Sequence, residues 1–143
     1  MNVNEKGVVG LIEVIRDLTK QGYECFTPFH DYSAIDLIAI KDYKLYRIQV
    51  KYRTLLRGII EVDLQSVVNG KKVPIDCNKI DGWAIYCPEV EKIVYIHKNE
   101  VDLQKSINFR LTLGSNRISG NKKRRKLYTD FGSVAEWPKA IGC

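Results

Sequence analysis

The sequence is poor in residues that could hold a structural metal or build a disulfide framework. Among its 143 residues are four cysteines, none in a CxxC pair, and two histidines, His30 and His97. A structural zinc site needs clustered Cys and His ligands, so we expect no zinc. The cysteines are interpreted as free thiols in a reducing cytoplasm.

Long apolar runs are also missing. No segment approaches the roughly 20 residues of a transmembrane helix. The chain opens on polar residues rather than on a basic and then apolar signal segment. These absences predict a cytoplasmic protein without a membrane partner. The content of 45% hydrophobic and 28% charged residues is that of a soluble globular protein. The length predicts a single domain over residues 1–143, with a core at about 5–106.

Acidic residues are absent between Ile107 and Tyr128, although the chain holds 17 Asp and Glu against 23 Lys and Arg. A basic segment on a chain of net charge +6 favours a nucleic-acid partner. A β-hairpin turning at 119–121 would fit the major groove and could grip phosphates, whereas a solvated basic loop is the alternative. The candidate DNA-binding residues here are Arg110, Arg117, Lys122, Lys123, Arg124 and Arg125. The tail, 129–143, carries no recognisable signal.

Hydrophobic periodicity predicts the elements. Apolar residues at helical spacing (Val8, Leu11, Ile12, Ile15 and Leu18) indicate an amphipathic helix that ends at Gly22 and packs on a sheet, with Glu13 on the solvent side. The pattern predicts strands over Tyr23–Phe29, Ala34–Ile40, Lys44–Tyr52, Gly58–Val62, Gly82–Cys87 and Lys92–Ile96, and a short helix around Val101–Ser106. Residues 63–81 are expected to leave the core. This order indicates an α/β (α+β) fold, a mixed sheet flanked by helices.

The second and third strands bring polar residues together. If a two-residue turn at Asp42–Tyr43 closes the hairpin, Asp36 lies opposite Gln49 and Lys51 lies opposite Ala34. Asp36 would supply the anionic oxygen that Mg²⁺ prefers, and Gln49 a neutral carbonyl oxygen. Lys51 would stabilise negative charge on a phosphate or position the attacking water. The alternatives are a turn-capping Asp and an ordinary solvated strand face.

These residues carry a resemblance to a known family. Gly7, Gly10, Leu18, Gly22-Tyr23, Pro28, Asp36-Leu37-Ile38-Ala39 and Gln49-Val50-Lys51 resemble the PD-(D/E)xK nucleases, and most closely the bacterial intron-encoded homing endonucleases of the restriction-enzyme fold. The resemblance implies a double-strand DNA endonuclease that uses Mg²⁺ or Mn²⁺. It implies Asp36, Gln49 and the Val50 backbone carbonyl as metal ligands, Lys51 in catalysis, and a homotetramer, with a dimer as the minimum.

One position departs from the pattern. The family's helix usually carries a Glu about eleven residues before the Gly-Tyr pair, and here that position is Leu11. The resemblance therefore indicates a nuclease that binds DNA but cuts it poorly. Arg53 and Arg57 follow Lys51 and are expected to touch the DNA backbone near the cut. A Holliday-junction-type resolvase and a non-catalytic DNA-binding protein of the same fold are the other interpretations.

Overall fold

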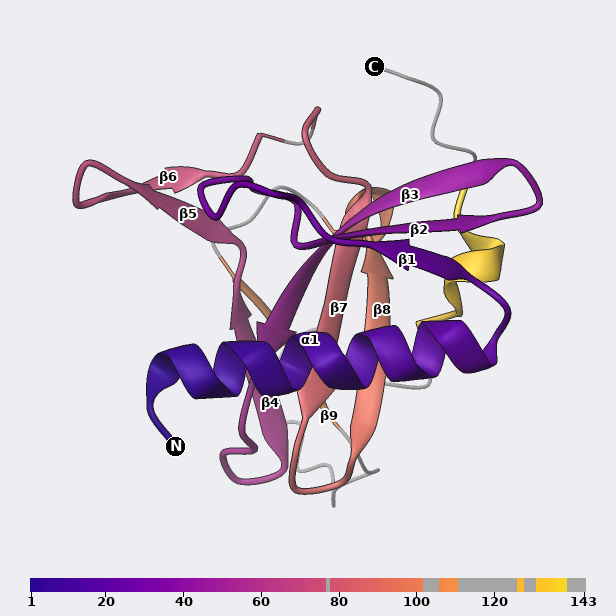
Figure 1. Cartoon of the computed structure of the whole chain (residues 1–143). Helices are drawn as coiled ribbons and strands as arrows, with labels where there is room; N and C mark the ends of the chain where they lie inside the picture. Colours follow the sequence, from indigo (N-terminus) through magenta and orange to yellow (C-terminus); the bar gives the residue numbers. More distant parts are fainter. Residues whose placement is uncertain (77, 102–105, 111–125, 128–130, 139–143) are drawn as a thin grey trace.

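The chain folds into three layers in the computed structural model, which describes residues 1–76, 78–101, 106–110, 126–127 and 131–138. Helix α1 (Val3–Lys20) crosses one face of a five-stranded sheet of order β1-β2-β3-β7-β8 (Figure 1). Its strands are β1 (Glu24–Phe26), β2 (Leu37–Lys41), β3 (Lys44–Tyr52), β7 (Gly82–Cys87) and β8 (Lys92–His97). The predicted mixed α/β class is confirmed.

A second, three-stranded sheet of order β10-β9-β4 lies on the other side of the central sheet. It is built from β4 (Ile59–Asp63), β9 (Ser106–Arg110) and β10 (Lys126–Leu127). Side chains of β4 and β9 share one apolar core with Trp83 and Ile85 of β7. In the described part of the chain, this face is therefore covered by strands, where the sequence led us to expect helices on both sides.

Two further features complete the chain. Strands β5 (Gln65–Val68) and β6 (Lys71–Pro74) form a separate hairpin, and short 3₁₀ turns lie at Lys98–Glu100 and Val134–Glu136. No helix among the described residues is long and apolar enough to cross a membrane. The short helix predicted around Val101–Ser106 is wrong at its end, because Ser106 already begins β9; residues 102–105 lie outside the described part.

Helix α1 begins earlier than its apolar pattern predicts. The Asn2 side chain accepts a hydrogen bond from the Glu5 backbone N–H, and the Glu5 carboxylate accepts one from the Asn2 N–H. This reciprocal capping box satisfies two of the N–H groups that a helix start leaves unpaired. The helix therefore starts at Val3 rather than near Val8.

The buried face of α1 is also rotated from the predicted one. Gly10, Val14 and Leu18 are buried, while Val8 and Ile12 are each 56% exposed. A Cβ added at Gly10 would lie 3.4 Å from the Cβ of Tyr52, so the helix packs closely on the sheet at this glycine. Apolar periodicity does not count a glycine as a contact, and this explains the error.

The β2–β3 hairpin has the predicted register. Lys41 pairs with Lys44 and Leu37 pairs with Ile48, so partner numbers sum to 85 as the two-residue turn requires. Asp42 and Tyr43 both adopt positive φ, of 52° and 62°. Such angles are those of a type I′ turn, whose twist matches the twist of the strands.

Strand β3 also pairs in parallel with β7, and a buried ion pair anchors this register. The Asp81 carboxylate accepts hydrogen bonds from the Arg47 backbone N–H at 2.7 Å and from the guanidinium at 3.2 and 3.0 Å. The Asp81 N–H in turn donates to the Arg47 carbonyl at 2.8 Å. Gln49 and Lys51, farther along β3, are therefore held opposite Trp83 and Ile85 of β7.

Candidate active site

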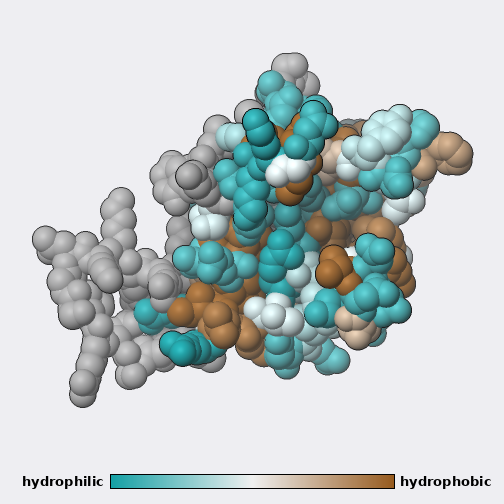
Figure 2. Space-filling model, turned by 90° about the vertical axis from the view of Figure 1, so that its left-hand side faces the viewer, coloured by the Kyte–Doolittle hydropathy of each residue, from teal (hydrophilic) through white to brown (hydrophobic). Residues whose placement is uncertain are grey.

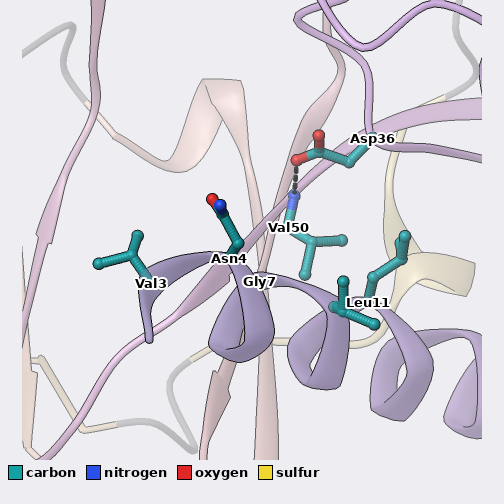
Figure 3. A pocket seen from close by; sticks show the side chains of 7 residues that line it. Val3, Asn4, Gly7, Leu11, Asp36 and Val50 are labelled. Carbon is teal, nitrogen blue, oxygen red and sulfur yellow. Dashed lines mark hydrogen bonds between the residues drawn. The ribbon is translucent and has the colours of Figure 1, made fainter. Parts of the chain in front are cut away.

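Asp36 lies where the chain enters β2, and two backbone contacts fix it against β3. Its N–H donates to the carbonyl of Ile48 at 3.0 Å. Its Oδ2 accepts from the Val50 N–H at 2.8 Å, the contact drawn in Figure 3. The carboxylate is therefore held against the backbone of β3 at Val50.

Asp36 opens onto a pocket of about 420 Å³ beside the first turns of α1. The helix contributes Leu11 and Asn4, and the sheet contributes Asp36 and Val50; Figure 3 shows these side chains around the same space. Leu11 is half-buried against the core between α1 and the sheet. Position 11 thus faces the same space as the Asp36 carboxylate, in agreement with the placement inferred from the helix periodicity.

Gln49 and Lys51 point into a neighbouring groove instead. The Gln49 Nε2 donates to the carbonyl of Ala34 at 3.3 Å, and its Oε1 accepts from the Trp83 Nε1 at 3.1 Å. These contacts hold the amide plane. Both side chains line a groove of about 580 Å³ between residues 31–34 and the β5–β6 hairpin. The predicted set is thus divided between two cavities that share no lining residue: Asp36 and Val50 line the first, and Gln49 and Lys51 line the second.

Burial shifts the pKa values of Asp36 and Lys51, the two ionisable residues of the predicted set. Desolvation raises the pKa of Asp36, against the opposing effects of the Val50 hydrogen bond and the Lys51 charge. Desolvation also lowers the pKa of Lys51, as does the charge of Arg53, while Asp63 and Asp36 act to raise it. Both side chains are partly buried, and the charge of each shifts the pKa of the other. This is the environment in which catalytic groups are usually found.

The other predicted residues have different settings. Arg53 is half-buried, its Nη1 donates to the Tyr52 carbonyl at 2.8 Å, and burial lowers its pKa. Arg57 is exposed, with a positive φ of 53°. Arg110 ends β9. Arg117, Lys122, Lys123, Arg124 and Arg125 lie outside the described residues, as does the predicted hairpin turn.

Sequence reasoning missed three residues at this site. Asn4 lines the Asp36 pocket, and the capping motif Asn2-x-x-Glu5 was the signal that the helix extends to it. Trp83 orients Gln49. Asp63, at the end of β4, is close enough to Lys51 to shift its pKa. Only the tertiary fold brings the last two to β3.

Glu13 does not lie on the solvent side as predicted. Its side chain is 34% exposed, and its charge raises the pKa of Tyr86, an effect smaller than that of the tyrosine's own burial. Tyr86 belongs to β7, whereas Leu11 lies beside Asp36. Glu13 is thus on the other flank of α1 and takes no part in lining the Asp36 pocket.

Comparison with known proteins settles the family. A family model described as "PD-(D/E)XK endonuclease" matches residues 1–131. The chain belongs to the PD-(D/E)XK endonuclease family. This nuclease also matches the solved structure of "a bacterial homing endonuclease: I-Ssp6803I", with a TM-score of 0.70 at 19% identity, over 92% of this chain and 88% of the other. No curated protein matches the nuclease sequence. The restriction-enzyme-like fold expected from the sequence is confirmed.

The site of this nuclease fits a hard divalent cation in kind. Asp36 and the Val50 carbonyl offer oxygen, which Mg²⁺ and Mn²⁺ prefer, whereas the Gln49 oxygen accepts from Trp83 Nε1 and faces the neighbouring groove, so it would have to turn to join them. The Val50 N–H binds Asp36 Oδ2, and the Asp36 side chain lines the pocket. Among the described residues no three Cys, His, Asp or Glu side chains converge. The pocket therefore offers a single carboxylate.

Proposed function

We propose that this nuclease is a site-specific double-strand DNA endonuclease of the homing kind, whose cutting is weakened by Leu11. The observation that supports it is the pocket shared by Asp36, Val50 and Leu11. It has the place for a helix carboxylate but holds a leucine there. The family supplies the nuclease chemistry, and the homing neighbour supplies the most specific comparison.

Each residue has a part in the proposed reaction. Asp36 and the Val50 carbonyl would hold Mg²⁺ or Mn²⁺, and the Gln49 oxygen would join them once its amide turns away from Trp83. When bound, this ion supplies Lewis-acid stabilisation of a phosphodiester undergoing hydrolysis. The Lys51 ammonium stabilises negative charge on the phosphate oxygens, and its partial burial makes that interaction stronger than it would be in water. The Val50 N–H holds Asp36 in place throughout.

Restoring the carboxylate tests the proposal. Leu11→Glu places a second acid in the Asp36 pocket, and we expect it to raise Mg²⁺-dependent cleavage of a selected duplex by orders of magnitude. Ile15→Glu is the matched control: Ile15 lies one turn along α1, is also half-buried, and is not among the pocket residues. Equal cleavage by the parent chain and Leu11→Glu would contradict the proposed role of position 11.

A second candidate is a DNA-binding protein that has kept the fold without cutting. The single carboxylate in the pocket favours it. The same experiment separates the two functions, because such a protein would bind duplex DNA and leave it intact even as Leu11→Glu with Lys51 present. A preference for four-way junctions over linear duplex would instead indicate a resolvase.

Two active sites are needed to cut two strands, so we propose that the nuclease acts as a homo-oligomer, a tetramer or at least a dimer. Light scattering on the purified chain, with and without DNA, measures the number of subunits. A monomer in both conditions would contradict this part of the proposal.

A further inference from the structure

The β5–β6 hairpin stands out from the body of the molecule on the side of the candidate active site (Figure 1). Its two strands are antiparallel, with Gln65 paired with Pro74 at the base and Val68 paired with Lys71 next to the turn. A tight turn at Asn69–Gly70, with φ of 51° and 74°, closes it. Four residues per strand span about 13 Å, and the major groove of B-DNA is about 12 Å wide and about 8.5 Å deep. A two-stranded ribbon of this size fits that groove.

The base of the hairpin is buried and its outer part is exposed. Leu64 and Ile75, which flank the hairpin, are 3% and 7% exposed and belong to the core under β4. Val67 and Val68 are 68% and 52% exposed. A hairpin rooted in the core that holds two valines in solvent has surface to offer to a partner. Figure 2 looks onto this side of the molecule, where hydrophilic and apolar side chains are interspersed.

Charged side chains link the hairpin to β3, the strand that carries Lys51. Lys72 Nζ lies 2.9 Å from Asp63 Oδ2, and Asp63 in turn acts on the pKa of Lys51. Val67, Val68 and Val73 line the same groove as Gln49 and Lys51. A duplex whose phosphate lies at Lys51 would therefore pass along the hairpin.

The hairpin has the side chains for groove contact. Lys71 is exposed next to the turn and makes no ion pair among the described residues, so its charge is available to a phosphate. An exposed valine can contact the C5-methyl group of thymine, an apolar feature found only in the major groove. Lys72, by contrast, is already paired with Asp63.

We propose that the β5–β6 hairpin enters the major groove of duplex DNA beside the scissile phosphate, with Lys71 on the backbone and Val67 and Val68 against thymine methyl groups. This inference rests on the proposed function, because it takes DNA as the substrate. It assigns sequence reading near the cut to a segment other than the basic stretch 107–128.

The test begins with a duplex selected from a random library by the unaltered chain, and the cut position is mapped with Leu11→Glu. Dimethyl sulfate then probes guanine N7, which lies in the major groove. We expect protection near the cut, lost in Val67→Ser/Val68→Ser. Replacing thymine by uracil in the protected stretch should weaken binding about fourfold per lost methyl contact, and should not affect the double variant. Lys71→Ala should reduce the slope of log affinity against log salt by about one.

Two controls match the changes. Val90→Ser alters a valine that is 37% exposed in the turn between β7 and β8, and Lys44→Ala alters an exposed lysine in the β2–β3 hairpin. Both should bind as the unaltered chain does. Reactive guanine N7 near the cut, or hairpin variants with unchanged footprints and affinity, would overturn the inference and leave the proposed function standing. A change of oligomeric mass without a change of footprint would make the hairpin a contact between copies, which also overturns it. Failure of the unaltered chain to bind any duplex would refute the proposed function itself.

Discussion

Removing the Asp81 carboxylate should destabilise this nuclease more than any change at a surface ion pair. The Asp81 side chain is 4% exposed and that of Arg47 is 22% exposed. Asp81→Ala deletes three hydrogen bonds to a charged acceptor and leaves the Arg47 guanidinium partly buried without its counter-ion. Breaking a buried pair in this way costs about 3–5 kcal/mol. Because Arg47 retains some access to water, we expect the lower end, about 3 kcal/mol.

Thermal unfolding followed by circular dichroism or calorimetry measures this loss. An unfolding entropy of about 2.1 cal/mol/K per residue makes about 3 kcal/mol equal to a fall in Tm of roughly 10 °C for a chain of this length. Asp63→Ala is the control, since the Lys72–Asp63 pair is 66% and 36% exposed and should contribute less than about 1 kcal/mol. A fall for Asp81→Ala no larger than that of the control would refute the claim that this pair anchors the β3–β7 register.

The same carboxylate gives a signed pH dependence. Burial acts to raise the pKa of Asp81, but the hydrogen bonds and charge of Arg47, together with the charge of Lys98, outweigh it and hold that pKa below its usual value. Asp81 therefore contributes stability above the ordinary aspartate pKa, and this stability is lost as the pH falls through the depressed pKa of the folded state. Asp81→Asn should flatten the acid side of the stability curve. If the stability of Asp81→Asn fell at acid pH as steeply as that of the unaltered chain, the role given to the Asp81 carboxylate would be contradicted.

Three further predictions concern the site and its supports. Asp36→Asn should raise the free energy of unfolding at pH 7 by roughly 0.5–2 kcal/mol, measured by urea titration. The raised pKa of Asp36 means that its ionised form opposes folding, so the gain should shrink as the pH falls through the raised pKa of the folded state and vanish below the ordinary aspartate pKa; no gain at pH 7 would contradict this. Gly7→Ala should stabilise α1 by about 0.5–1 kcal/mol because an added Cβ meets nothing within 4 Å. Gly82→Ala should cost at least about 2 kcal/mol, since its Cβ would collide with the Ile96 carbonyl and the Trp137 ring. The Tm of each glycine variant measures its effect. Equal changes of Tm in Gly7→Ala and Gly82→Ala would refute the two predictions.

The local geometry of the hairpin was predictable, and the surroundings of the site were not. The turn at Asp42–Tyr43 leaves one register in which both strands keep their apolar residues inward, so the position of Asp36 opposite β3 follows from the sequence. The direction of the carboxylate does not, because it depends on a bond to the Val50 backbone. The Gln49–Trp83 contact depends on parallel pairing between strands that are 30 residues apart, for which single-sequence periodicity holds no signal.

The rotation of α1 shows a second limit. Counting apolar residues placed Val8 and Ile12 inward, yet the buried face includes Gly10, which has no side chain to count. Leu11 nevertheless faces the sheet in both cases, because it lies near the centre of the predicted stripe and is partly buried beside the observed one. The inference about position 11 was therefore less sensitive to this error than the one about Glu13.

Gly10 also bears on how such a nuclease can lose its chemistry and keep its shape. The contact that brings α1 close to Tyr52 is made by a residue without a functional group, and the neighbouring residue, Leu11, lines the Asp36 pocket at the position where we propose that an acid would act on the ion. The helix–sheet packing thus depends on Gly10, whereas the proposed chemistry depends on the adjacent position 11. If the proposed function holds, the acid at position 11 can be lost without a change in the spacing of helix and sheet, and a single carboxylate at that position would restore the site.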